Sequence, residues 1–379
     1  MRKQTIIFVS VLLLLFGGPF VAYSAEGITY IVQPGDDLVK LSGEYLGNGA
    51  HYRAIFSATN DKHDSDSSFA KITDPFDVKP GWKLFIPAAG IDQEDYRISI
   101  VVGGLGFPEA PIWDSKRETL YWVEWSGDAI WAMKDGRANV AIKTKKGEGP
   151  NGLILDKDGN LWVCMYSSLE VVKMTPSGKV LQTIDNYNGK PFLGPNDFAM
   201  DANGGLYITD SGNFGVSADD DFSTGRPVGA IYYLTPKGKL LQVAKDISYA
   251  NGLVISHDGK SLIVAEHRRN CLLKYSINPD GTLSNKAVFF NMDTDCAVKA
   301  DLCWIIGPDG LKIDSKGNIW IAQLAGGKIV VVNPEGKLLR KIFLPKDGGG
   351  PTNVAFTPDE KTLYVTDGLL GLLYRIQFK

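Results

Sequence analysis

GPNGLILDKDGNLWVCMY, residues 149–166, contains every part of a unit that occurs six times after residue 105. A Gly/Pro turn is followed by one polar residue, a short apolar run, an Asp-Gly-type turn and a second apolar strand. The other copies begin at residues 106, 194, 249, 307 and 350. A unit of this kind repeated at about 45 residues is typical of β-propeller blades. The repeat predicts an all-β, six-bladed β-propeller over residues 96–379, and the spare strand at 98–103 is expected to complete the last blade.

The polar residue after each opening turn forms a column, because radial repetition aims equivalent positions at one central channel. The column consists of Glu109, Asn151, Asn196, Asn251, Asp309 and Thr352. Carboxylate and carboxamide oxygens are the ligands that Ca²⁺ prefers. Without a cation, Glu109 and Asp309 would face each other and one of them would have a raised pKa. The column therefore predicts a site for Ca²⁺ or another hard divalent cation.

Composition excludes some functions. The chain has 379 residues, a net charge of −3 and a sequence pI near 5.9. A nucleic-acid-binding protein needs a basic surface for the phosphate backbone, and nothing here supplies one. The length allows one large domain and an accessory module.

Residues 1–24 are expected to be a secretory signal peptide. Arg2 and Lys3 precede the apolar run 6–16, and small residues at 22–25 suit cleavage. The run is too short for a spanning helix, so no membrane span is expected after cleavage. We therefore expect an exported protein, periplasmic or extracellular.

Four cysteines are present in this predicted oxidising compartment. Cys296 and Cys303 share one loop just before the Asp309 turn, and a disulfide between them is one of two open alternatives. Cys164 lies inside a predicted strand and is expected to be a small buried hydrophobe.

Residues 28–88 form a separate module. Its opening Val-Gln-Pro-Gly-Asp-Asp-Leu, Asn60 and its ending Pro-Gly-Trp-Lys-Leu-Phe-Ile-Pro resemble a LysM domain, with a strand, two helices and a strand. The resemblance implies binding of peptidoglycan or another N-acetylglucosamine polymer, and so association with the cell wall. The polar stretch 61–77 is longer than is usual in that family, which leaves a spacer that binds nothing as the alternative. Residues 89–95 are expected to be a linker.

The propeller turns carry a second resemblance. Pro-Glu-Ala-Pro-Ile-Trp, Gly-Pro-Asn-Asp, Ala-Asn-Gly-Leu, Gly-Pro-Asp-Gly-Leu and Gly-Gly-Pro-Thr-Asn-Val-Ala-Phe are similar to turns of the SMP-30/gluconolactonase family, from about residue 98 onward. In that family a Glu, two Asn and an Asp bind one divalent cation, usually Ca²⁺. The matching residues are Glu109, Asn196, Asn251 and Asp309.

The resemblance implies metal-dependent hydrolysis of a lactone or ester. Asp309 would be the catalytic residue, either as a base or as a nucleophile. Asn151, Asn196 and Trp304 are candidates for contacting the substrate, although Asn151 is equally consistent with an unused repeat position and Trp304 with buried packing. The gluconolactonase proper carries an Arg at the position of Gly194, so the match is weaker for a sugar lactone than for a less polar ester.

Two alternatives stay open. The metal can be structural, in which case the propeller would be a non-enzymatic module that binds a glycan or protein partner. Four acids at strand ends are expected to bond turn backbone rather than to take part in the chemistry. They are Glu124, Asp210, Glu266 and Asp367. His267, beside Arg268 and Arg269, is expected at the surface.

Overall fold

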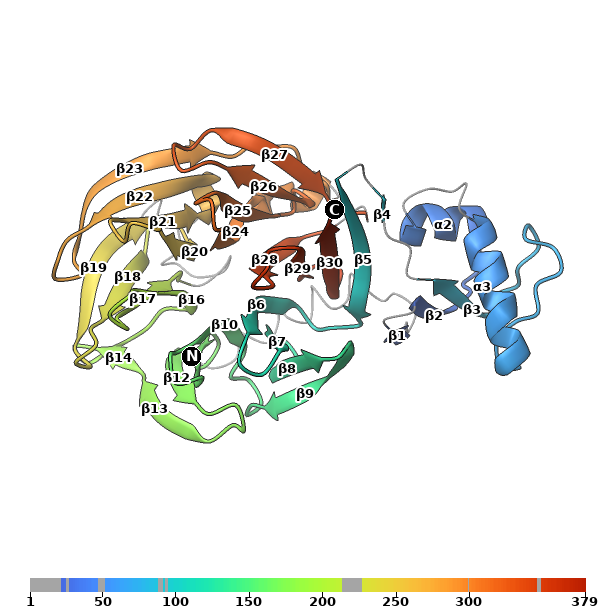
Figure 1. Cartoon of the computed structure of the whole chain (residues 1–379), viewed down its shortest axis with the longest axis horizontal. Coiled ribbons are helices and arrows are strands. Elements are labelled where there is room, and N and C mark those ends of the chain that lie inside the picture. Colours follow the sequence, from blue (N-terminus) through green and yellow to red (C-terminus); the bar gives the residue numbers. More distant parts are fainter. Residues whose placement is uncertain are drawn as a thin grey trace. The chain divides into compact units, whose positions relative to one another are not determined.

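A computed structural model of the chain consists of two units, with the division between residues 89 and 90 (Figure 1). The predicted signal segment 1–24 lies outside the described residues except for Ala22–Ser24. Residues 213–226 also lie outside them. Each unit is described by itself. The structure describes residues 22–24, 27–46, 52–87, 91–92, 95–212, 227–298, 300–345 and 349–379.

The first unit combines a three-stranded antiparallel sheet with two helices. The sheet has the order β1 (Ala22–Ser24), β2 (Gly27–Ile31) and β3 (Lys83–Pro87). Between β2 and β3 lie the helices α2 (Leu38–Leu46) and α3 (Tyr52–Ser65). Leu38, Leu41 and Tyr45 are buried, and their spacing of three and four places them on one face of α2. From β2 to β3 the element order is the one that the sequence predicts.

The long polar stretch before β3 is attached to α3 through Asn60. The side-chain amide of Asn60 donates to the carbonyl oxygen of Ile72 at 3.0 Å, and the Ile72 N–H donates back to the Asn60 Oδ1 at 2.8 Å. A side chain that pairs with both backbone groups of one residue acts as a substitute strand partner. In the described part of the chain, no helix is both long and apolar enough to cross a membrane.

The second unit contains six four-stranded antiparallel blades, as the repeat predicts, and a short extra hairpin (Figure 1). Blades one to three comprise β6 (Pro108–Asp114), β7 (Thr119–Glu124), β8 (Ala129–Lys134) and β9 (Arg137–Lys143); β10 (Pro150–Leu155), β11 (Leu161–Met165), β12 (Glu170–Met174) and β13 (Val180–Ile184); and β16 (Pro195–Met200), β17 (Leu206–Asp210), β18 (Gly229–Leu234) and β19 (Leu240–Ile247). The hairpin β14 (Asn186–Tyr187) and β15 (Lys190–Pro191) lies between blades two and three in the chain.

The remaining blades follow the same order. They comprise β20 (Ala250–Ile255), β21 (Ser261–Glu266), β22 (Cys271–Ile277) and β23 (Leu283–Asn291); β24 (Gly307–Ile313), β25 (Ile319–Leu324), β26 (Lys328–Val332) and β27 (Leu338–Phe343); and β28 (Pro351–Phe356), β29 (Thr362–Asp367), β30 (Leu372–Phe378) and β5 (Tyr96–Gly103). Short 3-10 helices occur at η2 (His267–Arg269) and η3 (Ala300–Ile305).

The last blade closes the ring with a strand from the beginning of the unit. β5 pairs antiparallel with β30, from Tyr96 opposite Phe378 to Gly103 opposite Leu372. This confirms the expectation that the spare strand completes the last blade. Within the predicted linker 89–95, β4 (Ile91–Asp92) adds a short edge to the same sheet.

The Asp-Gly turns of the repeat share one hydrogen-bonding device. In blade two, the Asp156 carboxylate accepts the backbone N–H groups of Asp158 and Asn160, each at 2.9 Å. Asp201 and Asp314 do the same in blades three and five. An acidic side chain that bonds to the backbone two and four residues onward fixes a tight turn, which explains why Asp recurs at this position.

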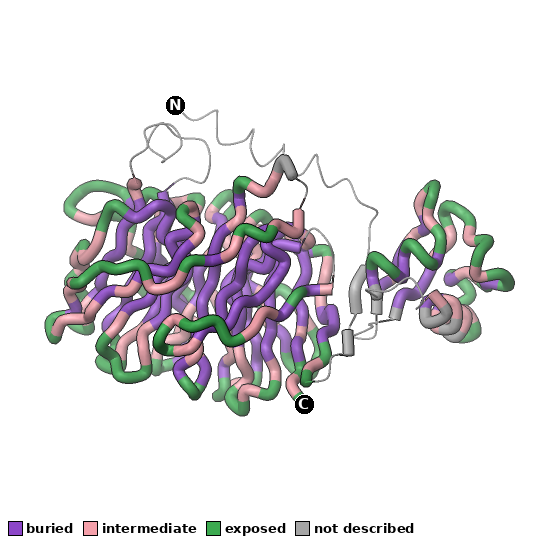
Figure 2. Tube along the Cα trace, turned by 90° about the horizontal axis from the view of Figure 1, so that it is seen from above, coloured by how far each residue is buried: buried purple, intermediate pink, exposed green. Residues whose placement is uncertain are grey.

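Buried residues concentrate in the strands, and exposed residues lie mostly in the loops at the two ends of the blades (Figure 2). The second strands β11, β17 and β25 are buried throughout, whereas the outermost strand β13 is largely exposed. Apolar side chains of adjacent blades interdigitate, so that Val163 of blade two packs in one cluster with Val123 of blade one. Apolar clusters between neighbouring blades therefore hold the inner strands in place.

The cysteines include a disulfide pair and a buried residue, both of which the sequence analysis considered. Cys296 and Cys303 form a disulfide in the loop between blades four and five. Cys164, on β11 of blade two, is buried in the apolar cluster between blades two and three and is not bonded to another cysteine, which confirms its predicted packing role.

Candidate metal and active site

The predicted ligands lie on the innermost strands of four blades. Each inner strand packs beside the next around the ring, and β28 returns to β6. Near the start of these strands, Glu109, Asn196, Asn251 and Asp309 are each only about 4 or 5% exposed. The structure therefore buries all four predicted ligands at the same level of the ring.

Glycine allows the inner strands to approach one another closely. A Cβ at Gly152 would collide with the carbonyl oxygen of Asn196, and a Cβ at Gly252 would collide with that of Asp309. These glycines directly follow the column in blades two and four. Their missing side chains bring the ligand-bearing strands together.

Three acids interact at this place. Burial raises the pKa of Glu109 well above its ordinary value, and the charges of Asp309 and Asp197 raise it further. Burial also raises the pKa of Asp309, with Asp197 as the second cause, while a hydrogen bond from Asn251 opposes the rise. Glu109 and Asp309 thus oppose each other as the sequence predicts, and Asp197 joins them.

Asp197 and Asn353 are functional candidates that the sequence analysis missed. Asn353 donates to the Asp197 carboxylate at 3.4 Å, although the two residues belong to blades three and six. Both directly follow a column residue, at a position where the other blades carry only Ala or Gly. Those positions are Ala110, Gly152, Gly252 and Gly310. Comparing this position across the repeats would have found both side chains.

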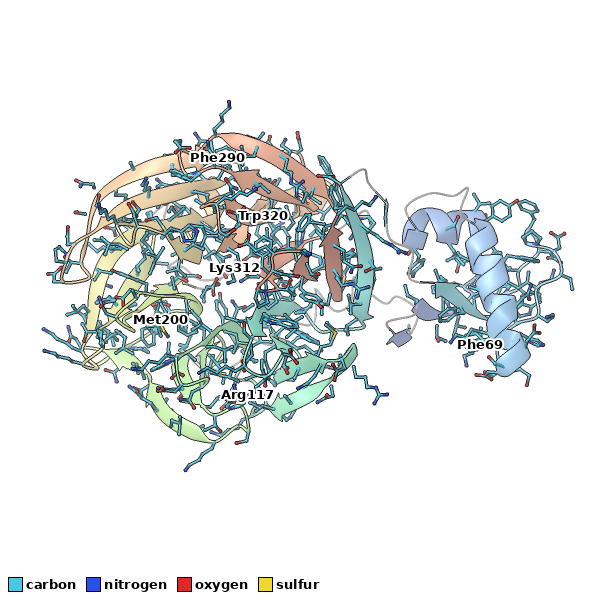
Figure 3. All side chains as sticks on the ribbon, in the orientation of Figure 1. Phe69, Arg117, Met200, Phe290, Lys312 and Trp320 are labelled. Carbon is cyan, nitrogen blue, oxygen red and sulfur yellow. A yellow bond between two sulfur atoms is a disulfide. The ribbon has the colours of Figure 1, made fainter. Side chains whose placement is uncertain are left out.

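Lys312 supplies a positive charge to the same cluster. Figure 3 labels it near the centre of the ring, on β24. Its charge lowers the pKa of Glu109 and is the main influence that opposes burial at Asp197. Lys312 is an exception at this position of the repeat. The equivalent residues of the other blades are apolar: Ile112, Ile154, Ala199, Val254 and Ala355.

The other residues named in the sequence analysis contact neighbouring strands or lie partly exposed. The side-chain amide of Asn151 donates to the backbone oxygen of Asn196 at 3.3 Å, which ties blade two to a ligand strand. Thr352 donates to the Pro108 carbonyl at 2.8 Å and locks blade six to blade one. Trp304 lies in η3 and is 47% exposed, so it is not simply buried packing.

The four acids at the strand ends bond to backbone, as expected. Each accepts an N–H from the turn that leads into the column of its own blade. The pairs are Glu124 with Gly106, Asp210 with Leu193 and Gly194, Glu266 with Ser248, and Asp367 with Gly350. These carboxylates hold the turns that lead to three of the predicted ligands and to Thr352.

His267 is buried, and its predicted surface position was wrong. It is 1% exposed, and its two ring nitrogens lie 3.0 Å from the carbonyl oxygens of Pro308 and Ile305. Burial lowers the pKa of His267 to about 4. The neighbouring arginines suggested a surface, but the first residue of η2 points inward and braces the turn before Asp309.

The donor set fits a hard divalent cation. In the part of the chain that the structure describes, no three His, Cys, Asp or Glu side chains are grouped as a metal site. A site here would therefore need amide oxygens, which Ca²⁺ accepts readily. Asn196 and Asn251 supply them beside two buried acids whose pKa values are raised, and a cation would offset the repulsion that Asp309 exerts on Glu109.

Comparison with known sequences agrees with this geometry. The sequence pattern of a family described as "SMP-30/Gluconolactonase/LRE-like region" matches residues 107–368. The chain belongs to this family. The match includes all four predicted ligands and leaves the first unit outside it.

The chain is similar in sequence to three named proteins. A gluconolactonase from Zymomonas mobilis is 25% identical over 286 residues, covering 71% of this chain and 78% of the relative. The diisopropyl-fluorophosphatase of Loligo vulgaris is 30% identical over 257 residues, covering 65% and 78%. Lactonase drp35 of Staphylococcus aureus is 26% identical over 225 residues, covering 57% and 64%.

Solved structures show the same fold. A gluconolactonase from Xanthomonas campestris aligns with a TM-score of 0.63 at 22% identity, covering 76% of this chain and 91% of its own. Regucalcin from Agrobacterium tumefaciens, described as a calcium-binding protein, aligns with a TM-score of 0.59 at 20% identity, covering 74% and 94%. These likenesses support the six-bladed architecture of this member of the family.

Proposed function

We propose that the propeller is a divalent-metal-dependent hydrolase of a lactone or another carboxylic ester. The observation that carries the proposal is the buried pair Glu109 and Asp309, flanked by Asn196 and Asn251, at the centre of a family propeller. The relatives named as lactonases support the same chemistry. Ca²⁺ suits the donor set best.

The proposal assigns a role to each of these residues. Glu109, Asn196, Asn251 and Asp309 would hold the cation, which when bound supplies a Lewis acid for the substrate carbonyl. Asn251 donates a hydrogen bond to Asp309 and so fixes the orientation of its carboxylate. Asp309 accepts a proton from the attacking water, and burial limits competition from bulk solvent.

Replacing Asp309 by Asn tests the proton-accepting role. Asp309→Asn keeps an oxygen ligand but removes the basic carboxylate, so we expect kcat to fall by about 10²–10⁴-fold. The rise in melting temperature on adding Ca²⁺ should persist. Asp280→Asn, at an exposed turn of blade four, is the matched control and should retain activity. Equal hydrolysis by Asp309→Asn would refute this role for Asp309.

Metal dependence is tested on a panel of lactones and aryl esters, with EDTA and with Ca²⁺ restored. The proposal requires activity that the chelator abolishes and calcium recovers. If no ester is hydrolysed while Ca²⁺ still raises the melting temperature, the site is structural and the propeller is a binding module for a glycan or protein.

We further propose that the first unit tethers an exported enzyme to peptidoglycan through residues 28–88. The order of strand and helices from β2 to β3 and the turn sequences support this proposal. The full chain should sediment with insoluble peptidoglycan, and a variant lacking residues 28–88 should stay in the supernatant. Unchanged sedimentation of the deletion variant would refute the tether.

A further inference from the structure

Aromatic rings from blades one, two and four lie at the end of the propeller at which the ligand column begins. We name Phe107, Trp125, Tyr166 and Tyr249 the aromatic collar. Phe107 and Tyr249 each lie two residues before a predicted ligand, and Trp125 and Tyr166 directly follow β7 and β11. The first two strands of each blade are antiparallel. The first strand therefore starts at the same end of the propeller at which the second strand ends.

The collar is continuous from blade one to blade four. Phe107 and Trp125 meet edge to face at 5.8 Å, and Trp125 meets Tyr166 in the same way at 6.4 Å. The hydroxyl of Tyr249 then donates to the hydroxyl of Tyr166 at 3.1 Å.

Three of the four rings each cover a glycine of a neighbouring blade. A Cβ at Gly149 would lie 2.7 Å from the Trp125 indole nitrogen, and one at Gly194 would lie 2.8 Å from the Tyr166 ring. One at Gly368 would lie 2.8 Å from the Phe107 ring. The space beside Gly194 is therefore already filled by an aromatic ring, and a longer side chain there would displace Tyr166.

Two collar residues hold a strained backbone. Phe107 and Tyr249 have φ of 59° and 61°, a left-handed conformation that is unusual for bulky residues. Such strain costs on the order of 1–3 kcal/mol and gathers at ligand-binding sites. Glycine would remove the cost, as at Gly149, which has a φ of 56° at the same position in blade two.

The polar atoms of the collar are already used within the protein. The Tyr166 hydroxyl donates to the Gly212 carbonyl at 2.8 Å, and the Trp125 indole N–H donates to the Ser167 hydroxyl at 3.1 Å. Arg268 lies over the Tyr249 ring at 5.6 Å. Phe107, Trp125 and Tyr166 are only partly buried, so apolar ring surface rather than hydrogen-bonding groups remains for a ligand.

We infer that the aromatic collar selects lactones or esters that carry an aromatic or other apolar ring over polyhydroxylated sugar lactones. The inference rests on the proposed hydrolase function. An apolar ring gains contact with the collar. A sugar lactone would lose hydrogen bonds to water, and the collar offers few groups to replace them.

The first measurement compares kcat/KM for γ-phenyl-γ-butyrolactone and D-glucono-1,5-lactone on the calcium-loaded full chain. We expect the phenyl lactone to be preferred by roughly tenfold or more. Preference for the gluconolactone would overturn the inference while leaving the proposed hydrolase intact. Hydrolysis of neither lactone, nor of any aryl ester, would instead refute the proposed function, and the inference with it.

Variants assign the preference to the collar. Trp125→Leu and Tyr166→Leu should each raise KM for the phenyl lactone by roughly tenfold, while the calcium-induced rise in melting temperature is kept. Tyr166→Phe keeps the ring and should keep the preference. Trp113→Leu is the matched control, because Trp113 stacks on Tyr364 at the opposite end of β6. If neither collar variant changes the ratio of the two substrates, or if Trp113→Leu changes it equally, the inference is wrong.

Discussion

At the scale of single residues, the buried acids couple stability to pH in the metal-free protein. Folding raises the pKa of Glu109 and Asp309 above their unfolded values. The stability that these groups contribute is fully present below the unfolded pKa, near 4, and is lost as pH rises through the folded pKa. We expect Glu109→Gln in EDTA to melt above the wild type by a margin that grows from pH 5 to pH 8. A margin that is constant or shrinks would contradict the repulsion.

Lys312 provides a second test at this scale. Its charge offsets part of the acid cluster, so Lys312→Met should destabilise the metal-free protein and also remove a charge that repels the cation. Both effects should enlarge the rise in melting temperature that calcium causes. If they change the free energy of stabilisation by calcium by about 1 kcal/mol, the rise should grow by ~2–4 °C. Lys316→Met, on the exposed turn that follows β24, is the control. An unchanged or smaller rise would show that Lys312 does not act on the site.

At the scale of elements, the approach of β20 to β24 depends on Gly252. Gly252→Ala would force a methyl group against the Asp309 carbonyl and separate two ligand strands. We expect a loss of about 1–3 kcal/mol of stability and weaker calcium binding by titration calorimetry. Ala110→Gly is the matched control, because Ala110 occupies the same position in blade one with a strained φ of 44°. Calcium binding as tight in Gly252→Ala as in wild type would refute this role for the glycine.

The sequence predicted the blades well because each one repeats the same turn chemistry. Asp156, Asp201 and Asp314 fix equivalent hairpins with equivalent hydrogen bonds, so local residues suffice to locate the strands. The inner-strand position of the column residues was predictable for the same reason. Asp197 and Asn353 meet across the ring, and no local pattern indicates a contact between blades three and six. The position of His267 likewise depends on blade five, whose carbonyl groups receive it.

At the scale of the whole molecule, ring closure should decide whether the propeller exists at all. A chain of residues 90–379 keeps β5 and should fold, whereas residues 104–379 leave the edge of β30 unpaired. An exposed, apolar strand edge favours aggregation. Size-exclusion chromatography and circular dichroism should show a folded monomer only for the longer chain. A stable monomer of residues 104–379 would contradict the importance of closure.

The pairing of β5 with β30 also sets the order of events during synthesis. β5 leaves the ribosome before any blade is made, yet its main partner is the last strand of the propeller to be translated. Blades one to five can assemble from neighbouring segments, while the sixth requires contact between the two most distant parts of the unit. Long-range contacts of this kind are slow to form, since the loop that they close must first be ordered. Throughout translation the nascent protein is therefore an open arc whose two ends need protection, and the ring around the proposed metal site is complete only when those ends meet.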